Sequence, residues 1–177
     1  IIFIRNQYDI ITSSYLQYVK EGGNYSLSQY IYHKKYTRSN RTALFSYSHF
    51  DYLNLISKYE NLIGRQNVYV YLHEDFVNNQ KQFIESFIKE HNFEIDITSI
   101  DFSKTNSSYS YLSLFLARII NSFSRKNVLY KYYIFHIPLI YEYTREILRR
   151  ISIFPIHNKT FLGKKIQTDI QKKYAES

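Results

Sequence analysis

The chain has 177 residues, 45% of them hydrophobic, which is enough for one domain with a sizeable core. The 4 Gly and 2 Pro exclude a disordered or turn-repeat composition, and the lack of Cys excludes a disulfide framework and a thiolate metal site. A chain without Cys fits a reducing cytoplasm. The sequence contains no run of eighteen apolar residues, so we predict no membrane span.

The net charge of +8 and the pI near 9.4 have two interpretations. A basic surface can lack special meaning, or it can attract an anion such as a nucleotide, a sulfated or phosphorylated substrate, a nucleic acid or a membrane surface. Many cations lie late in the sequence and can equally form solvated helix faces: Arg145, Arg149, Arg150, Lys159, Lys164, Lys165, Lys172 and Lys173.

The chain opens with an apolar run, residues 1–4, which predicts a short strand buried on both faces. Asp9 is predicted to cap the helix that follows, and Gly22 with Gly23 is predicted to end it. Apolar residues recur at helical spacing on one face of this helix: Ile11, Tyr15, Tyr18 and Val19.

Three further elements are expected before residue 65. The sequence Ser-Leu-Ser-Gln at 26–29 is a capping box that predicts a second, shorter helix. Residues 36–47 are polar and basic and indicate a loop. A third helix is predicted over 48–63, with Gly64 as its end.

The β-branched and aromatic run "NVYVYL", residues 67–72, predicts a second strand, followed by "HEDF" and an amphipathic helix over 79–91. The order is therefore β-α-α-α-β-α. Helical crossovers between apolar strands indicate an α/β fold with a parallel sheet in residues 1–92.

Residues 93–177 are predicted to be mostly helical. One helix is expected over 110–123, and a second from Pro138 through Arg150. Thr160 is expected to cap a last helix, with Gly163 an early weak point in it.

The chain contains no Met, and its first residues are typical of a buried strand. We therefore expect a piece of a longer protein, a single but incomplete domain truncated at its N-terminal side. Two strands do not form a stable sheet alone, so the preceding segment is expected to supply others.

Arg5 follows the first predicted strand, and Ser13 lies early in the next helix. Ligands of open α/β sheets bind beyond the carboxyl ends of the strands, and a guanidinium with a hydroxyl suits a phosphate dianion. Asp9 opposes a phosphate unless its carboxylate faces away. The alternative is that Arg5 pairs with Asp9 and Ser13 faces solvent.

A resemblance to a known protein family supports the predicted phosphate site at Arg5 and Ser13. The stretch "IIFIRNQYDIITSSYLQYV" resembles the strand-helix segment of sulfotransferases that use 3′-phosphoadenosine-5′-phosphosulfate (PAPS). In that family an apolar strand is followed by Arg, three residues, Asp, three residues, Ser and often an aromatic residue. The matching residues, in order and spacing, are Arg5, Asp9, Ser13 and Tyr15.

Later stretches extend this resemblance. Residues 45–93 are similar to the helix, turn, strand and "yEdl" element of the family. The stretch "KTNSSYSYLSLFLARIINSF" at 104–123 is similar to a Lys-x-Asn-x-Ser segment plus helix in bacterial members that modify carbohydrates. Residues 161–177 are loosely similar to the last helix.

The resemblance implies a partial P-loop-like, three-layer fold in which Arg5 and Ser13 hold the 3′-phosphate of PAPS. It implies a parent enzyme that transfers a sulfuryl group to a hydroxyl or amine, with a carbohydrate as the expected acceptor. The phosphosulfate loop, its Lys and the general base precede Ile1 in the family, so this segment alone is expected to be inactive. The resemblance implies a structural role for Glu74 and Asp75 after the second strand. We prefer the interpretation that Asp75 or Asn79 caps a helix there.

No catalytic residue and no metal ligand is assigned. The six His show no metal spacing such as His-Glu-x-x-His, and surface or capping roles are favoured for His73-Glu74-Asp75. Arg38, Arg41 and His49 are hypothesised to contact an anionic acceptor.

Two alternatives remain open. The 20 Tyr interleave with basic residues as in single-strand nucleic-acid binding modules, although half-buried helix faces or an AT-rich coding bias would also enrich Tyr. The other alternative is a different phosphate-binding α/β enzyme, such as one with a kinase-like fold. The expected partners are PAPS and a glycan, without nucleic acid.

Overall fold

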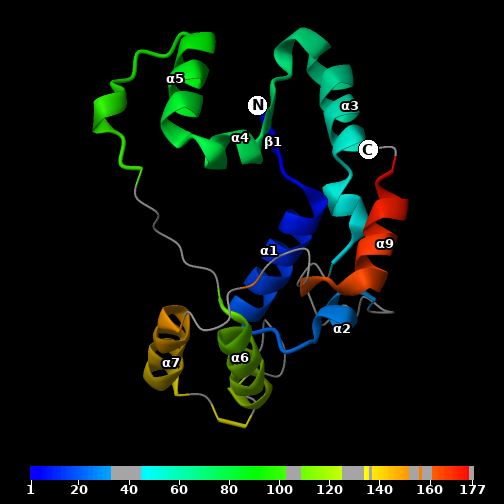
Figure 1. The fold of residues 1–177 in the computed structure, drawn as a ribbon, viewed down its shortest axis with the longest axis vertical. Helices are drawn as coiled ribbons and strands as arrows, with labels where there is room; N and C mark the ends of the chain where they lie inside the picture. Colours follow the sequence, from blue (N-terminus) through cyan, green and yellow to red (C-terminus); the bar gives the residue numbers. More distant parts are fainter. Residues whose placement is uncertain are drawn as a thin grey trace. The chain divides into compact units, whose positions relative to one another are not determined.

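The computed structural model describes residues 1–32, 45–102, 109–124, 134–135, 137–151, 156 and 161–175. These parts are helix-rich and contain a small two-stranded parallel sheet, which is a coarse α/β architecture (Figure 1). The contacts divide the chain into two compact units. One comprises Ile1–Asn6 and Asp51–Asn106, the other Gln7–Phe50 and Ser107–Glu176. The predicted α/β part, residues 1–92, is divided between the two units, since Gln7–Phe50 belongs to the second.

The sheet of the first unit consists of β1 (Ile2–Ile4) and β2 (Val70–Leu72). The two strands are parallel, as predicted, with Phe3 opposite Tyr71 in the register. The prediction that the first strand is buried on both faces is wrong for the described structure, since the Phe3 side chain is 51% exposed. A two-stranded sheet has too few neighbours to cover both faces of each strand.

Helix α3 (Tyr52–Ile63) is the helix of this unit that precedes β2. It begins later than predicted, because Asp51 accepts a hydrogen bond from the N–H of Asn54 at 3.1 Å and caps it, while Tyr47–Phe50 forms a separate 3-10 turn, η1. Gly64 ends α3 as predicted, with a φ of 84° that favours glycine. The short turn η2 (Arg65–Asn67) leads into β2.

After β2 the chain forms α4 (His73–Asn78), α5 (Gln80–Glu90) and the turn η3 (Ile97–Ser99). Asn79 caps α5 by accepting from the N–H of Gln82 at 3.2 Å, which confirms one of the two expected caps. Rings from β1, β2 and α5 contact one another, with the centroids of Phe3 and Tyr71 separated by 5.6 Å. These aromatic contacts hold α5 on the sheet.

The second unit contains five described helices: α1 (Gln7–Lys20), α2 (Leu27–Ile31), α6 (Tyr111–Ser124), α7 (Pro138–Arg150) and α9 (Gly163–Lys173). Asp9 lies in the first turn of α1 instead of capping it, because the helix begins at Gln7, three residues earlier than a cap at Asp9 implies. The predicted apolar face is confirmed for Ile11, Tyr15 and Val19, all of which are buried.

The other helix boundaries of this unit follow local chemistry. Ser26 and Gln29 form the predicted capping box, with reciprocal hydrogen bonds of 3.2 and 2.8 Å. Helix α7 has the predicted bounds, with Pro138 at its start. Gly163 begins α9 with a φ of 69°, and the predicted cap Thr160 lies outside the described residues.

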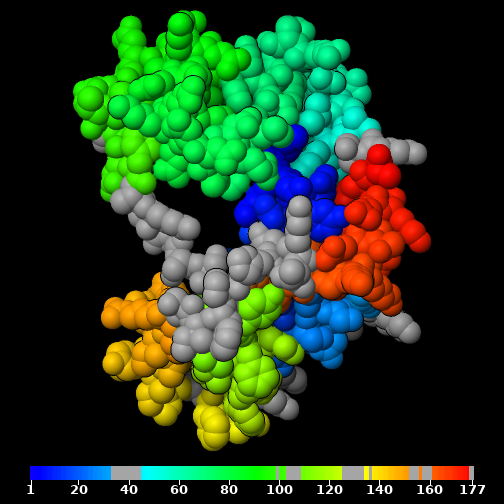
Figure 2. All heavy atoms as spheres, in the orientation of Figure 1, coloured from blue at the N-terminus to red at the C-terminus, as the bar shows by residue number. Residues whose placement is uncertain are grey.

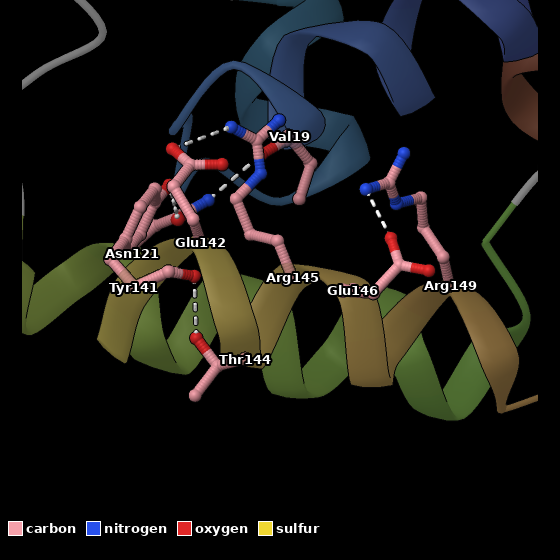
Figure 3. A network of polar contacts seen from close by, with 8 residues as sticks. All are labelled: Val19, Asn121, Tyr141, Glu142, Thr144, Arg145, Glu146 and Arg149. Carbon is pink, nitrogen blue, oxygen red and sulfur yellow. Dashed lines mark hydrogen bonds and ion pairs between the residues drawn. The ribbon is translucent and has the colours of Figure 1, made fainter. Parts of the chain in front are cut away.

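Helices α6 and α7 of the second unit lie side by side (Figure 1 and Figure 2), and a buried polar residue joins them to α1. The side-chain amide of Asn121 on α6 donates to the carbonyl oxygens of Val19 and Gly23, at 2.9 and 2.8 Å. Its Oδ1 accepts from the hydroxyl of Tyr141 on α7 at 2.9 Å (Figure 3). Asn121 therefore satisfies the carbonyls at the end of α1 and fixes α7 on α6.

Within the part of the chain that the structure describes, every helix is too short or too polar to cross a membrane.

Candidate functional site

The candidate site lies at one edge of the sheet in the first unit. Ile4 pairs with Leu72 in the parallel register, so Arg5 and His73 both follow directly after their strands at the same edge. This is the edge at which open α/β sheets bind ligands. The parallel pairing therefore gives Arg5 the location that the sequence predicted.

After β1, two backbone N–H groups contact side-chain oxygens of other elements. The N–H of Asn6 donates to Oε1 of Glu74 at 2.8 Å, and the N–H of Arg5 lies 3.4 Å from the hydroxyl oxygen of Tyr52. Glu74 belongs to the first turn of α4 and Tyr52 to the first turn of α3. Residues from three elements thus converge around Arg5.

The charges at this edge are coupled. Partial burial by itself would raise the pKa of the Glu74 carboxyl. Hydrogen bonds from the N–H groups of Asn6 and Glu74, together with the charges of His73 and Arg5, lower this pKa by more than burial raises it. The net effect lowers the pKa of Glu74, so this side chain is an anion at neutral pH. Burial raises the pKa of the Tyr52 hydroxyl, which stays neutral and polar beside Arg5.

Arg5 is partly buried. Its Nε is shielded from solvent, while the residue as a whole is half-buried. A guanidinium presents several N–H donors in a fixed plane. An Arg in this setting can bind a phosphate oxygen pair, with Glu74 limiting how much net positive charge the site carries.

Ser13, the second predicted phosphate ligand, lies on α1 of the second unit and is half-buried. Arg5 belongs to the first unit, so their joint contact with one phosphate stays a prediction.

Of the three predicted acceptor contacts, His49 lies in the described part of the chain. It is exposed on η1 and packs edge-to-face with Phe50, at 6.4 Å between ring centroids. Arg38 and Arg41 lie outside the described residues. The acceptor hypothesis therefore stays a prediction.

The sequence did not indicate that Tyr52, within the helix predicted over 48–63, lies beside Arg5. Nothing in the sequence marks the backbone of Asn6 as a hydrogen-bond donor to a distant side chain. Glu74 was expected beyond the strand, and its contact with Asn6 across 68 positions gives that place a physical role. The parallel topology predicted from the sequence was the feature that could have indicated these contacts, because it brings the ends of both strands to one edge of the sheet.

The described tyrosines of the second unit act mainly in packing. Tyr15, Tyr30, Tyr109, Tyr141 and Tyr174 are buried. The Tyr15 hydroxyl donates to the carbonyl of Tyr25 at 2.9 Å, and the centroids of Tyr18 and Tyr30 are 4.9 Å apart. Rings used in this way are not available for stacking on bases.

In the described part of the chain, no group of three or more His, Asp or Glu side chains is arranged to hold a metal ion. Comparison with protein-family models, with curated proteins and with solved structures finds no match for this chain.

Proposed function

We propose that this chain contributes the 3′-phosphate site of a PAPS-dependent sulfotransferase with a P-loop-like fold, and that Arg5 and Ser13 bind this phosphate. The observation that supports the proposal most is the parallel pairing of β1 with β2, after which Arg5 emerges at the carboxyl edge of the sheet. The half-buried guanidinium supplies charge and planar donors, and the Ser13 hydroxyl supplies one more hydrogen bond.

The role of this site in sulfuryl transfer is to position the donor. In the reaction the bond between sulfur and the phosphate oxygen breaks, a bond from sulfur to the acceptor oxygen or nitrogen forms, and a base takes the acceptor proton. The 3′-phosphate is remote from these bonds. Its binding energy orients the nucleotide so that the sulfuryl group is in line with the acceptor.

The acceptor is proposed to be a carbohydrate, contacted by Arg38, Arg41 and His49. Replacing these three residues with Ala in the full-length protein should raise the KM for a sulfated or carboxylated polysaccharide acceptor and leave the affinity for the nucleotide unchanged. Unchanged KM and kcat would remove the acceptor assignment.

The phosphate site is tested by calorimetric binding of two nucleotides to the full-length protein. Adenosine 3′,5′-bisphosphate carries the 3′-phosphate, and adenosine 5′-monophosphate lacks it. Arg5→Ala should weaken binding of the bisphosphate by roughly 1.5–3 kcal/mol, the usual contribution of a charged hydrogen bond. Its effect on the monophosphate should be small.

Arg65→Ala is the matched control, because Arg65 lies in the same unit with a 90% exposed side chain and a loose ion pair of 3.7 Å to Glu60. It should bind both nucleotides like the unchanged protein. Equal losses for the two nucleotides, or no loss in Arg5→Ala, would reject the assignment.

A further inference from the structure

Two contacts restrain the backbone on both sides of the Arg5 Cα. The N–H of Arg5 lies 3.4 Å from the hydroxyl oxygen of Tyr52, and the N–H of the next residue, Asn6, donates to Oε1 of Glu74 at 2.8 Å. Each N–H belongs to a rigid peptide plane, so these contacts restrain the two planes that meet at Arg5. The direction in which the Arg5 side chain leaves the backbone depends on both planes.

Glu74 makes the firmer of the two contacts, because 2.8 Å is a good hydrogen-bond length and 3.4 Å is a long one. The strand pairing ends with Ile4 opposite Leu72. Asn6 and Glu74 each lie two residues beyond this last pair. The Glu74 carboxylate therefore continues the contact between the two chain segments after the pairing of β1 with β2 has ended.

The charge of Glu74 and its hydrogen bond have opposite effects on an anion at Arg5. Burial has the largest single influence on the pKa of Glu74, but the charge of Arg5 also acts on it, so the two side chains are close enough to interact. A carboxylate at this place repels a phosphate. Its charge is therefore unfavourable for phosphate binding, whereas the bond that fixes the backbone is favourable.

We propose that Glu74 is a positioning residue of the phosphate site, which fixes the direction of Arg5 through the hydrogen bond with the Asn6 N–H. The proposal rests on the proposed function, since the anion concerned is the 3′-phosphate bound by Arg5. Ordering a long side chain on binding costs conformational entropy, and a backbone that is already fixed reduces this cost. Glu74 acts through Arg5 and not on the phosphate itself.

The test is calorimetric binding of adenosine 3′,5′-bisphosphate and adenosine 5′-monophosphate to the full-length protein. Glu74→Ala removes the acceptor and should weaken binding of the bisphosphate about fivefold or more. Glu74→Gln keeps an acceptor oxygen without the charge, so it should bind the bisphosphate as well as the unchanged protein, or more tightly. Binding of the monophosphate should change little in both variants.

Glu74→Asp keeps the charge but shortens the side chain by one methylene group, so its carboxylate reaches the Asn6 N–H less well. It should bind the bisphosphate more weakly than Glu74→Gln does, and this comparison decides the matter even where Glu74→Ala does not fold. Hydrogen exchange of the Asn6 amide is a second readout. It should be faster in Glu74→Asp than in Glu74→Gln.

A double-mutant cycle separates a positioning role from a merely structural one. In an Arg5→Ala background, Glu74→Ala should weaken binding of the bisphosphate by less than about twofold further, because the residue through which it acts is gone. Asp75→Ala is the matched control, since Asp75 lies in the same turn of α4 with an exposed side chain. It should bind both nucleotides like the unchanged protein.

The proposal is overturned if Glu74→Gln binds the bisphosphate as weakly as Glu74→Asp, if Glu74→Ala folds and binds it normally, or if the losses in the double variant add. In each of these cases a selective loss of the bisphosphate in Arg5→Ala leaves the proposed function standing. Absence of that loss in Arg5→Ala rejects both the proposed function and the role of Glu74.

Discussion

The backbone N–H of Asn6 donates a 2.8 Å hydrogen bond to Oε1 of Glu74, and this bond ties the end of β1 to the first turn of α4. The two residues are separated by 68 positions and meet because β1 and β2 run parallel and end together. The bond restrains the backbone next to Arg5. It also holds a carboxylate close enough to the guanidinium to interact with its charge.

The first prediction concerns the charge of Glu74. Its pKa is lowered in the fold, so its carboxylate stabilises the protein above its ordinary pKa of 4.5, and this contribution disappears as the pH falls through the folded-state value. Glu74→Gln keeps the acceptor oxygen but not the charge. At neutral pH it should lower the free energy of unfolding by about 0.5–1 kcal/mol, since the bond lies near solvent.

The measurement is thermal or urea unfolding of both proteins at neutral and acidic pH, where the difference should vanish at low pH. Tyr52→Phe is a useful control, because its 3.4 Å contact with the Arg5 N–H is weak, and its loss should change stability little at any pH. A pH-independent effect of Glu74→Gln would contradict the role of its charge.

The second prediction concerns Asn121, whose side chain makes three buried hydrogen bonds. Asn121→Ala leaves two carbonyls and one hydroxyl without this partner and should lower the free energy of unfolding by about 3 kcal/mol or more. Tyr141→Phe removes one of these bonds and should cost about 1 kcal/mol.

Urea unfolding followed by circular dichroism measures both losses. Ser122→Ala is the control on the same helix, because the Ser122 hydroxyl bonds just the carbonyl of Arg118 one turn earlier. It should be nearly neutral. A loss in Asn121→Ala no larger than in Ser122→Ala would show that Asn121 does not join the helices.

The third prediction concerns Gly23, where an added Cβ would lie 2.2–2.5 Å from ring atoms of Tyr18. The Tyr18 ring packs on Tyr30 and its hydroxyl accepts from the N–H of Tyr25 at 3.3 Å, so it does not move freely. Gly23→Ala should destabilise the second unit by about 2 kcal/mol or more, through overpacking. The same change in a Tyr18→Ala background should cost less, because the clashing ring is gone.

Gly163→Ala separates this clash from backbone strain. Apart from its chain neighbours and its own helix backbone, no atom of the described residues lies within 4 Å of its added Cβ, but its φ of 69° disfavours Ala. It should cost about 1 kcal/mol. Equal melting temperatures for Gly23→Ala and the unchanged protein would rule out the clash.

The fourth prediction concerns alkaline pH. Burial raises the pKa of Tyr15 and Tyr18 to about 12, and burial with a hydrogen bond to Glu90 raises that of Tyr71 to about 12. An unfolded chain ionises these groups near 10, so their contribution to stability is complete below pH 10 and is lost as the pH rises toward 12.

Phenolate absorbance should therefore rise later in the folded protein than in urea, and the melting temperature should fall above pH 10. Tyr71→Phe should make that fall less steep. Coincident titration curves of the folded and unfolded protein would contradict the burial of these hydroxyls.

The sequence by itself determined most of the local structure. Helix α7 begins at Pro138, α2 begins with the Ser26 capping box, and α3 ends at Gly64, because caps and glycine conformations depend on neighbouring residues. The order of strands and helices likewise predicted a parallel pair with Arg5 after the first strand. These features depend on local propensity and on one topological rule.

Only the tertiary structure decided which residues meet. Periodicity shows which side of a helix is apolar, but it does not show what covers that side. Phe115 on α6, Leu139 on α7 and Phe3 on β1 are exposed, because no other described residue covers them. The Asn6–Glu74 bond, the burial of Asn121 and the interleaved units depend on the chain path, which brings together residues about 70–100 positions apart.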